Sequence, residues 1–327
     1  MNTPRLLSPN QYYENLLLAV RHARRRIAFS AMIGLWDDVT QPLFETALQA
    51  AQRGVDVHIM FDRFGMGPLG EGLNLTPSFW RRRAATLNAF ERLKTAGVRV
   101  SLTGTFKSLN PYKGRYHAKI FVADTTYFSF GGINFSQNSF LSKDYMLSGD
   151  DAIVSDVLWE LLDRQATDSI SEDLRLPLDD DNAILFDSGI AGRSIIYETA
   201  CELLQQSKKA IYVSQMAPSN VLAVALRKIP YEAYFNRPSQ PPFPDSLGLF
   251  IDQHRYGIQN KYTGKDYIHA KFILFDLKDG GKAVISGSNN FSWRGVAYGT
   301  EEIALLSHDA KVYAQLAHFA AQLTRSA

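Results

Sequence analysis

The sequence predicts an α/β protein made of two pseudo-symmetric halves, each a mixed β-sheet flanked by helices. Three observations support this fold class. Helical patterns alternate with short apolar strands, each half opens with an amphipathic helix followed by a strand, and one phrase of polar residues occurs once in each half. We therefore expect the halves to pack about a pseudo-two-fold axis, with one site at their junction.

The first half shows the alternation of helices and strands most clearly. The helix expected over 84–96 ends at Gly97, and Arg53-Gly54 separates another helix from an alternating apolar strand. The pattern predicts helices over 11–25, 43–52 and 84–96, and strands over 27–30, 55–61 and 98–102.

The second half repeats the opening, with a helix expected over 193–206 and a strand over 211–214. Between the halves, residues 167–192 contain Pro177 and an acidic run, which is typical of a solvated linker. We therefore divide the chain into an N-terminal domain, 1–170, and a C-terminal domain, 171–327, each carrying one copy of the phrase.

Composition sets broad limits on the class of protein. Apolar residues make up 46% of the 327, and the formal net charge is +2, so bulk electrostatics favour no particular partner. The single cysteine, Cys201, excludes an internal disulfide. The first residues show no apolar signal core, and no run approaches the roughly 18 apolar residues of a membrane helix. We expect a cytoplasmic protein that meets a membrane only from its surface.

The repeated phrase is the most informative feature of the chain. In both copies a histidine stands two residues before a lysine, the lysine stands five before an aspartate, and a small-residue pair and an asparagine follow. The copies are His117, Lys119, Asp124, Gly131-Gly132 and Asn134, and His269, Lys271, Asp276, Gly287-Ser288 and Asn290.

Residue types in the phrase suit a phosphodiester. Residues two apart in a strand share a face, so each histidine lies beside its lysine. The lysines can neutralise nonbridging oxygens, and the asparagine amides can donate hydrogen bonds to them. Small residues let the backbone approach the phosphate. We expect phosphate contacts from Asn134, Asn290, Ser288 and Gly132.

A catalytic histidine needs a partner that fixes its tautomer. Acidic residues follow both phrases, and we assign Asp144 to His117 and Glu301 to His269 as orienting carboxylates. Asp124 and Asp276 fall at strand ends near turns, where a structural role is favoured over contact with substrate.

These residues resemble the double motif of the phospholipase D superfamily, His-x-Lys-x4-Asp followed by Gly-Gly or Gly-Ser and an asparagine. Residues 50–57 and the segment Gly131-Gly132-Ile133-Asn134 are similar to bacterial cardiolipin synthases. The resemblance covers most of residues 10–315 and implies two phospholipase D-like halves. It also implies a covalent phosphohistidine on His117, proton transfer by His269, and no metal or other cofactor.

The chain departs from that branch in several places. The first motif reads His-Ala-Lys, and residues 290–295 look closer to superfamily nucleases. The second phrase is four residues longer, which predicts a hairpin turn at 278–281. Two segments favour loops, a glycine-rich stretch over 65–72 that is either a flexible connection or an apolar rim of the site, and a proline-rich surface loop over 238–244.

Two arginine clusters bear on the substrate, Arg24–Arg26 and Arg81–Arg83, the second after Phe79-Trp80. An aromatic pair beside arginines suits an anionic membrane or single-stranded nucleic acid, and solvated helix ends are the simpler alternative. Because the net charge is near neutral, we rank phosphatidyl transfer or phospholipid hydrolysis first. A metal-independent endonuclease acting on DNA or RNA comes second, and a non-catalytic binding protein third.

Overall fold

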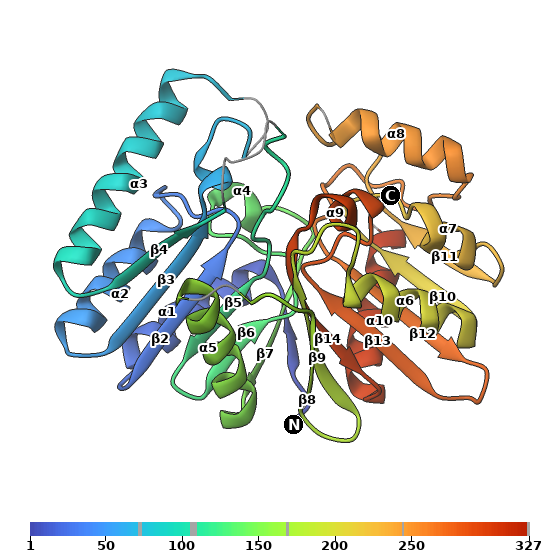
Figure 1. Ribbon diagram of the computed structural model, residues 1–327, viewed down its shortest axis with the longest axis horizontal. Coiled ribbons are helices and arrows are strands. Elements are labelled where there is room, and N and C mark those ends of the chain that lie inside the picture. Colours follow the sequence, from blue (N-terminus) through green and yellow to red (C-terminus); the bar gives the residue numbers. More distant parts are fainter. Residues whose placement is uncertain (71–73, 105–109, 168–169, 244, 326–327) are drawn as a thin grey trace.

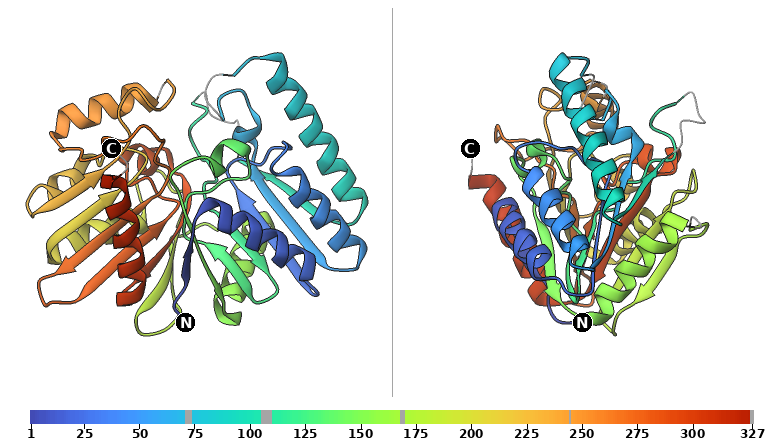
Figure 2. Two further views of the ribbon diagram at one scale, coloured as in Figure 1. Left: turned by 180° about the vertical axis from the view of Figure 1, so that it is seen from behind. Right: turned by 90° about the vertical axis from the view of Figure 1, so that its left-hand side faces the viewer.

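The computed structural model describes residues 1–70, 74–104, 110–167, 170–243 and 245–325, and within them two seven-stranded mixed sheets lie side by side (Figure 1). The strand orders are β1-β7-β6-β5-β2-β3-β4 and β11-β10-β12-β13-β14-β9-β8. Helices flank both sheets (Figure 2). The predicted α/β fold class with two alike halves is confirmed.

The first sheet contains β1 (Arg5–Leu7), β2 (Arg26–Ala31), β3 (Asp56–Asp62), β4 (Arg99–Thr103), β5 (Ile120–Ala123), β6 (Thr126–Ser129) and β7 (Met146–Asp150). Its helices are α1 (Pro9–His22), α2 (Gln41–Gln52), a short 3-10 turn (Arg63–Met66), α3 (Pro77–Thr95), α4 (Gln137–Phe140) and α5 (Ala152–Thr167). Ser8 starts α1 with a capping box closed by Gln11, which satisfies backbone donors at the helix start.

The second sheet contains β8 (Leu174–Pro177), β9 (Asn182–Ser188), β10 (Ser207–Val213), β11 (Tyr231–Tyr234), β12 (Phe272–Leu277), β13 (Lys282–Gly287) and β14 (Glu301–Ser307). Its helices are α6 (Ile195–Gln206), α7 (Asn220–Leu226), α8 (Asp245–Tyr256), α9 (Trp293–Tyr298) and α10 (Ala310–Arg325). The expected turn at 278–281 joins β12 to β13, with Gly280 at a φ of 95°.

The two sheets share a common arrangement of strands. The series β3-β2-β5-β6-β7-β1 corresponds to β11-β10-β12-β13-β14-β9, with one parallel pair followed by antiparallel neighbours in both. The motif strands are therefore β5 and β12, each third in its series. Both motif histidines precede these strands in the chain, so they lie at the same end of the two sheets.

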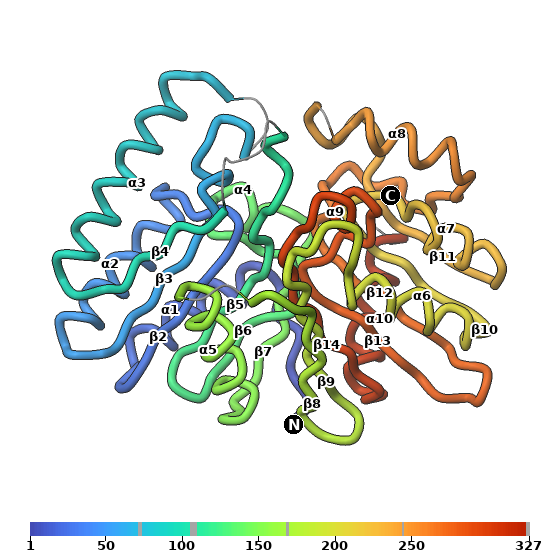
Figure 3. Tube along the Cα trace, in the orientation of Figure 1, coloured from blue at the N-terminus to red at the C-terminus, as the bar shows by residue number. Residues whose placement is uncertain are grey.

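One apolar core joins the halves. Ala118, just before β5, and Ile120 at its start belong to the same buried cluster as Ala270 and Phe272 of the second half and as the inner faces of α5 and α10. Two outer cores lie between the sheets and the outer helices. The N-terminal segment also runs along the junction, where the Leu6 amide donates to Gln315 at 2.8 Å (Figure 3). Because the central core belongs to both halves, the division at residue 170 stays a prediction.

The expectation of a solvated linker over 167–192 is wrong, although residues 168 and 169 lie outside the described part. This segment folds into the β8–β9 hairpin, and β9 is buried between β8 and β14. The acidic run is the hairpin turn, where Asp179 binds the amino terminus of Met1. The run of apolar residues Ala183–Phe186 was the signal for a buried strand.

Candidate active site

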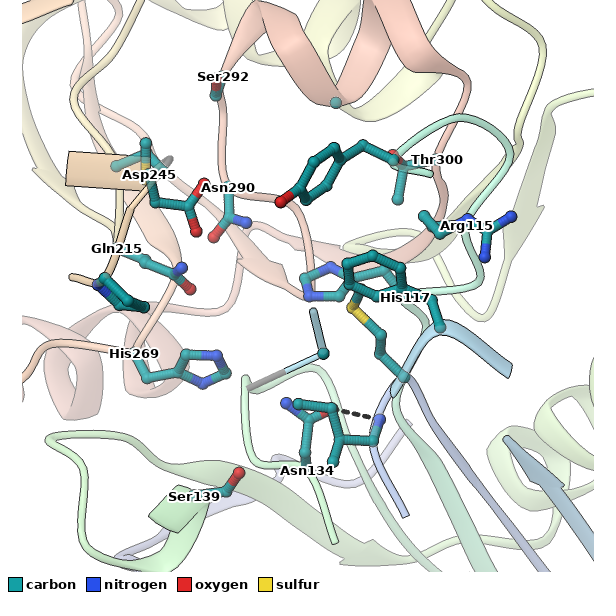
Figure 4. A pocket seen from close by; sticks show the side chains of 18 of the residues that line it. Arg115, His117, Asn134, Ser139, Gln215, Asp245, His269, Asn290, Ser292 and Thr300 are labelled. Carbon is teal, nitrogen blue, oxygen red and sulfur yellow. Dashed lines mark hydrogen bonds between the residues drawn. The ribbon is translucent and has the colours of Figure 1, made fainter. Parts of the chain in front are cut away.

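A cavity of about 750 Å³ lies where the two sheets meet. Both motif histidines line it, with Asn134 from the first half and Asn290 from the second. Figure 4 shows the two imidazoles on neighbouring walls, with both asparagines beside them. The structure therefore brings both copies of the phrase into one site.

Each histidine is held by the backbone of the opposite half. The His117 amide donates to the Glu301 carbonyl at 2.8 Å, and the Glu301 amide donates to the Arg115 carbonyl at 2.8 Å. The second phrase mirrors this, since the His269 amide donates to the Lys143 carbonyl at 3.0 Å. Isolated bridges Tyr116–Glu301 and Lys143–Ile268 result. The two motifs thus fix each other's position across the junction.

The histidine–carboxylate pairs also cross the junction. Nδ1 of His117 lies 2.9 Å from Oε1 of Glu302, and Nδ1 of His269 lies 2.8 Å from Oδ2 of Asp144. The expected pairing of Asp144 with His117 and of Glu301 with His269 is wrong. Because each histidine lies beside the start of β7 or β14 of the other half, its partner comes from there: Asp144 lies just before β7, and Glu302 lies at the start of β14. Nδ1 of each ring therefore contacts a carboxylate, and Nε2 is the ring nitrogen outside this contact.

Glu301 is directed away from the site. Its carboxylate accepts a hydrogen bond from Gln165 of α5, and burial raises its pKa to about 8. Adjacent residues in a strand face opposite sides, so only one of Glu301 and Glu302 can reach a histidine. The bridge positions match Glu301 with Lys143, and they therefore match Glu302 with Asp144.

The two carboxylates have different supports. Asp144 Oδ1 accepts from the backbone amides of Gly132, at 3.2 Å, and Tyr145, at 2.8 Å. Glu302 Oε2 instead accepts from the Asn289 side chain, whose Oδ1 accepts from the Phe291 amide at 2.6 Å. The sequence analysis did not single out Asn289, although its place directly before Asn290 in the second phrase was a usable signal.

Both lysines are buried beneath the histidines. Lys119 Nζ donates to the His117 carbonyl at 2.7 Å, and Lys271 Nζ donates to the His269 carbonyl. Burial is the main cause that lowers both pKa values, to about 8 for Lys271 and well below the usual range for Lys119, which also faces the charge of Lys271. Neither is among the described residues lining the cavity. Their contact with a phosphate stays a prediction.

Burial and the neighbouring lysine charges lower the pKa of both imidazoles. Burial is the main cause that lowers the pKa of His269 to about 4, and the charge of Lys271 adds to it. Burial, followed by the charges of Lys119 and Lys271, holds the pKa of His117 well below 6.5. Neutral Nε2 atoms can act as nucleophiles or bases at neutral pH, and an anionic ligand between them would favour protonation of one ring.

The small residues of the phrases have packing roles. A Cβ on Gly132 would lie 2.4 Å from the His269 carbonyl oxygen and 2.6 Å from Asp144 Oδ2, so only glycine fits. The Ser288 hydroxyl accepts from the Ile303 amide at 3.0 Å and is fully buried. Neither residue lines the cavity within the described structure, and their phosphate contacts stay predictions.

The motif aspartates stabilise turns and helices outside the cavity. Asp124, at a φ of 53°, accepts from the backbone amides of Arg24, Arg25 and Arg26 at 2.9 to 3.1 Å. Asp276 accepts from Lys282 and from Tyr313 of α10, each at 2.6 Å. These contacts tie β5 and β12 to the neighbouring elements. They also place the first arginine cluster at the start of β2, the end of the sheet opposite the cavity.

Two arginines that the sequence did not predict as site residues, Arg115 and Arg294, line the cavity. Arg115 donates to the buried carboxylate of Asp62 at 3.1 Å, and Asp62 also accepts from the Tyr116 amide at 2.6 Å. Arg294 donates to Asp252 of α8 at 3.2 Å. A Cβ on Gly248 would lie 1.8 Å from the Arg294 guanidinium, so this glycine makes room for it. Arg115 stands two residues before His117, which was a signal for its place.

Two further properties of the described residues concern metal binding and membrane crossing. Among the described residues, no group of three or more His, Cys, Asp and Glu side chains is arranged to hold a metal ion. Across the same residues, no helix combines the length and apolarity that crossing a bilayer requires.

Comparisons with known proteins match part of the chain to one family. Residues 16–164 match the family described as cardiolipin synthase, phospholipase D-like domain. Cardiolipin synthase B of Escherichia coli K12 is 30% identical over 158 residues, 45% of this chain and 34% of that protein. Its counterpart in Salmonella typhi is 27% identical over 46% of this chain and 35% of its own. The match thus spans about a third of these relatives' length.

Solved structures extend the likeness to the fold of the whole chain. Phosphatidylserine synthase of Haemophilus influenzae superposes with a TM-score of 0.71 at 14% identity, over 99% of this chain and 88% of that one. Polyphosphate kinase of Porphyromonas gingivalis reaches 0.62 at 14% identity, over 98% and 47%. At this identity the solved structures show the shared fold alone. The family match over residues 16–164 confirms the resemblance to the phospholipase D superfamily and to its cardiolipin synthase branch.

Proposed function

We propose that this protein cleaves phosphodiesters through a covalent phosphohistidine and transfers or hydrolyses a phosphatidyl group. The observation that carries the proposal is the pair of imidazoles in one cavity, each contacting a buried carboxylate from the opposite half. Two oriented imidazoles supply a nucleophile and an acid–base group without further chemistry.

The proposed reaction has two displacements at phosphorus. Nε2 of His117 attacks, the bond to the leaving alcohol breaks, and protonated His269 gives its proton to the departing oxygen. His269 then takes a proton from an acceptor alcohol or water, the acceptor oxygen attacks phosphorus, and the phosphorus–nitrogen bond breaks. Lys119, Lys271 and the Asn134 and Asn290 amides would stabilise the negative charge on the nonbridging oxygens.

The rim of the cavity supports a lipid substrate. Leu141 and Phe243 line the cavity and are 76% and 70% exposed. On α8, Leu247, Phe250 and Ile251 form an outward apolar stripe at helical spacing, each about half exposed. In Figure 1, α8 and the start of α3 lie at the same end of the molecule as α4.

The start of α3 continues the apolar rim. Leu75 is 60% exposed, Trp80 is 45% exposed, and the Arg83 guanidinium lies 5.6 Å from the Trp80 ring centre. Leu69 and Gly70 of the glycine-rich segment line the cavity, while residues 71 and 72 of that segment lie outside the described residues. Exposed apolar side chains with arginine and tryptophan suit the surface of an anionic bilayer. We therefore infer peripheral contact with lipid through this rim.

Side-by-side incubation with phosphatidylglycerol vesicles and with labelled single-stranded DNA, both in EDTA, tests the function. We expect phosphatidyl products by mass spectrometry and intact DNA. Cleavage of DNA alone would replace the lipid proposal with a nuclease, and turnover of neither substrate would contradict both.

Vesicle sedimentation tests the rim separately. The double variant Leu247→Ser, Phe250→Ser should bind anionic vesicles at least about 10-fold more weakly, because it removes half-buried apolar contacts with the bilayer. Leu18→Ser and Ile153→Ser are matched controls, since both side chains are similarly exposed but lie on α1 and α5. Equal loss in the controls would contradict the assigned surface.

A further inference from the structure

The cavity wall beside His269 presents two hydrogen-bond acceptors that lack a donor. Oδ1 of Asn290 is buried and accepts from no described residue. Asp245, in the first turn of α8, also lines the cavity, and none of the described groups donates a hydrogen bond to its carboxylate. Figure 4 shows the Asp245 carboxylate directed toward the Asn290 amide, with Gln215 and His269 below them. Facing acceptors repel each other unless a donor lies between them.

The charges around Asp245 narrow the kind of donor. Burial raises the pKa of Asp245, and the nearby Arg294 guanidinium opposes that change. Arg294 is held in place by Asp252 at 3.2 Å and by the space that Gly248 leaves. A cationic ligand at Asp245 would meet the positive charge of Arg294. A neutral hydroxyl would not, and its single O–H can donate to either of these two acceptors.

The expected orientation of Asn290 also places an acceptor beside Asp245. An amide side chain has one donor group and one acceptor group. If Nδ2 donates to a nonbridging phosphate oxygen, Oδ1 is turned away from the phosphate, toward Asp245. Asn134 differs, because its Oδ1 already accepts from the Ile33 amide at 3.4 Å. Of the two motif asparagines, only Asn290, on the His269 side, therefore has a side-chain oxygen without a donor among the described residues.

We propose that Asp245 and Oδ1 of Asn290 form a subsite for a second hydroxyl group of the alcohol that leaves or attacks the phosphate. The preferred alcohols are therefore polyols. This inference rests on the proposed function, because His269 must handle the proton of the same alcohol. Asp245 is a specificity-determining residue in this scheme and takes no part in bond making.

A partition experiment tests the subsite. The donor is a phosphatidyl p-nitrophenyl ester, whose leaving group has no second hydroxyl, with glycerol and 1-propanol present together as acceptors. Nitrophenol release reports the first step, and the ratio of the two phosphatidyl products, measured by mass spectrometry, reports acceptor choice. Because both products come from the same folded molecules, the ratio does not depend on how much of a variant folds.

Wild-type protein should favour glycerol, and Asp245→Ala should lower the glycerol-to-propanol ratio by about 10-fold, the usual size of a lost charge-assisted hydrogen bond. Asp180→Ala, which removes an exposed carboxylate of the β8–β9 turn that does not line the cavity, should keep the wild-type ratio. An unchanged ratio in Asp245→Ala overturns the subsite. A second mixture, with ethanolamine in place of 1-propanol, distinguishes a cation site, and an Asp245-dependent preference for ethanolamine over glycerol also overturns the subsite. If nitrophenol is released but water is the only acceptor used, the subsite is overturned and the proposed function is not. No release at all overturns the proposed function with it.

Discussion

The two histidine–carboxylate pairs occupy matching places but have different supports. Asp144 is held by backbone amides, one of them from Gly132, whereas Glu302 is held by the Asn289 side chain. Burial raises the pKa of Glu302 to about 8. The comparison teaches that one repeated phrase can hold its histidines through different contacts, so their roles need not be equal.

Replacing the two motif histidines should have the largest effect on activity, and it should show whether their roles differ. We expect His117→Ala and His269→Ala each to lose roughly 10³-fold or more in turnover of phosphatidylglycerol, because each ring takes part in both displacements. With the p-nitrophenyl ester, whose leaving group needs no proton, His269→Ala should still form the covalent adduct and His117→Ala should not. Acid quenching and mass spectrometry of the protein measure this.

His22→Ala serves as the control, since this histidine is exposed on α1 and contacts only the helix backbone. An adduct in His117→Ala but not in His269→Ala would reverse the two roles. Full activity in either histidine variant would contradict the proposed active site.

Neutralising the orienting carboxylates should give the next largest effect. Asp144→Asn and Glu302→Gln should each lower kcat by about 10² to 10⁴-fold, because the paired histidine loses the partner that fixes its tautomer. Glu301→Gln is a matched control, with the same chemistry one residue away and its side chain on α5. We expect it to change kcat by less than about 10-fold. A larger effect of Glu301→Gln than of Glu302→Gln would restore the original pairing.

The alkaline limb of activity should report the lysine of the second half. The pKa of Lys271 is lowered to about 8, so its positive charge is present below that pH and is lost as the pH rises through it. kcat/KM should therefore fall above about pH 8. Lys271→Arg should move this limb upward by at least about one pH unit, because guanidinium stays charged. Lys94→Arg, at an exposed position of α3, is the control, and an unmoved limb in Lys271→Arg would assign it to another group.

Much of this site could be predicted from the sequence, and its failures have physical causes. Histidines, lysines and asparagines recur at fixed spacing, so local order alone identified them. The carboxylate pairing depends on which strands meet across the junction, a contact between residues 185 positions apart for His117 and Glu302. The linker error arose because a turn and a linker share acidic residues, and burial of β9 is decided by its neighbours β8 and β14.

Exchanging the small residues between the halves should give the smallest effects and sharpen the comparison. Gly132→Ser places a Cβ against Asp144 and the His269 carbonyl, which we expect to cost about 1–3 kcal/mol of unfolding free energy. Ser288→Gly removes one hydroxyl bonded to Ile303, worth about 0.5–1.5 kcal/mol. Urea unfolding measures both, and kcat should fall further in Gly132→Ser because the shifted Asp144 orients His269. Equal effects of the two exchanges would show that backbone and side-chain supports are interchangeable.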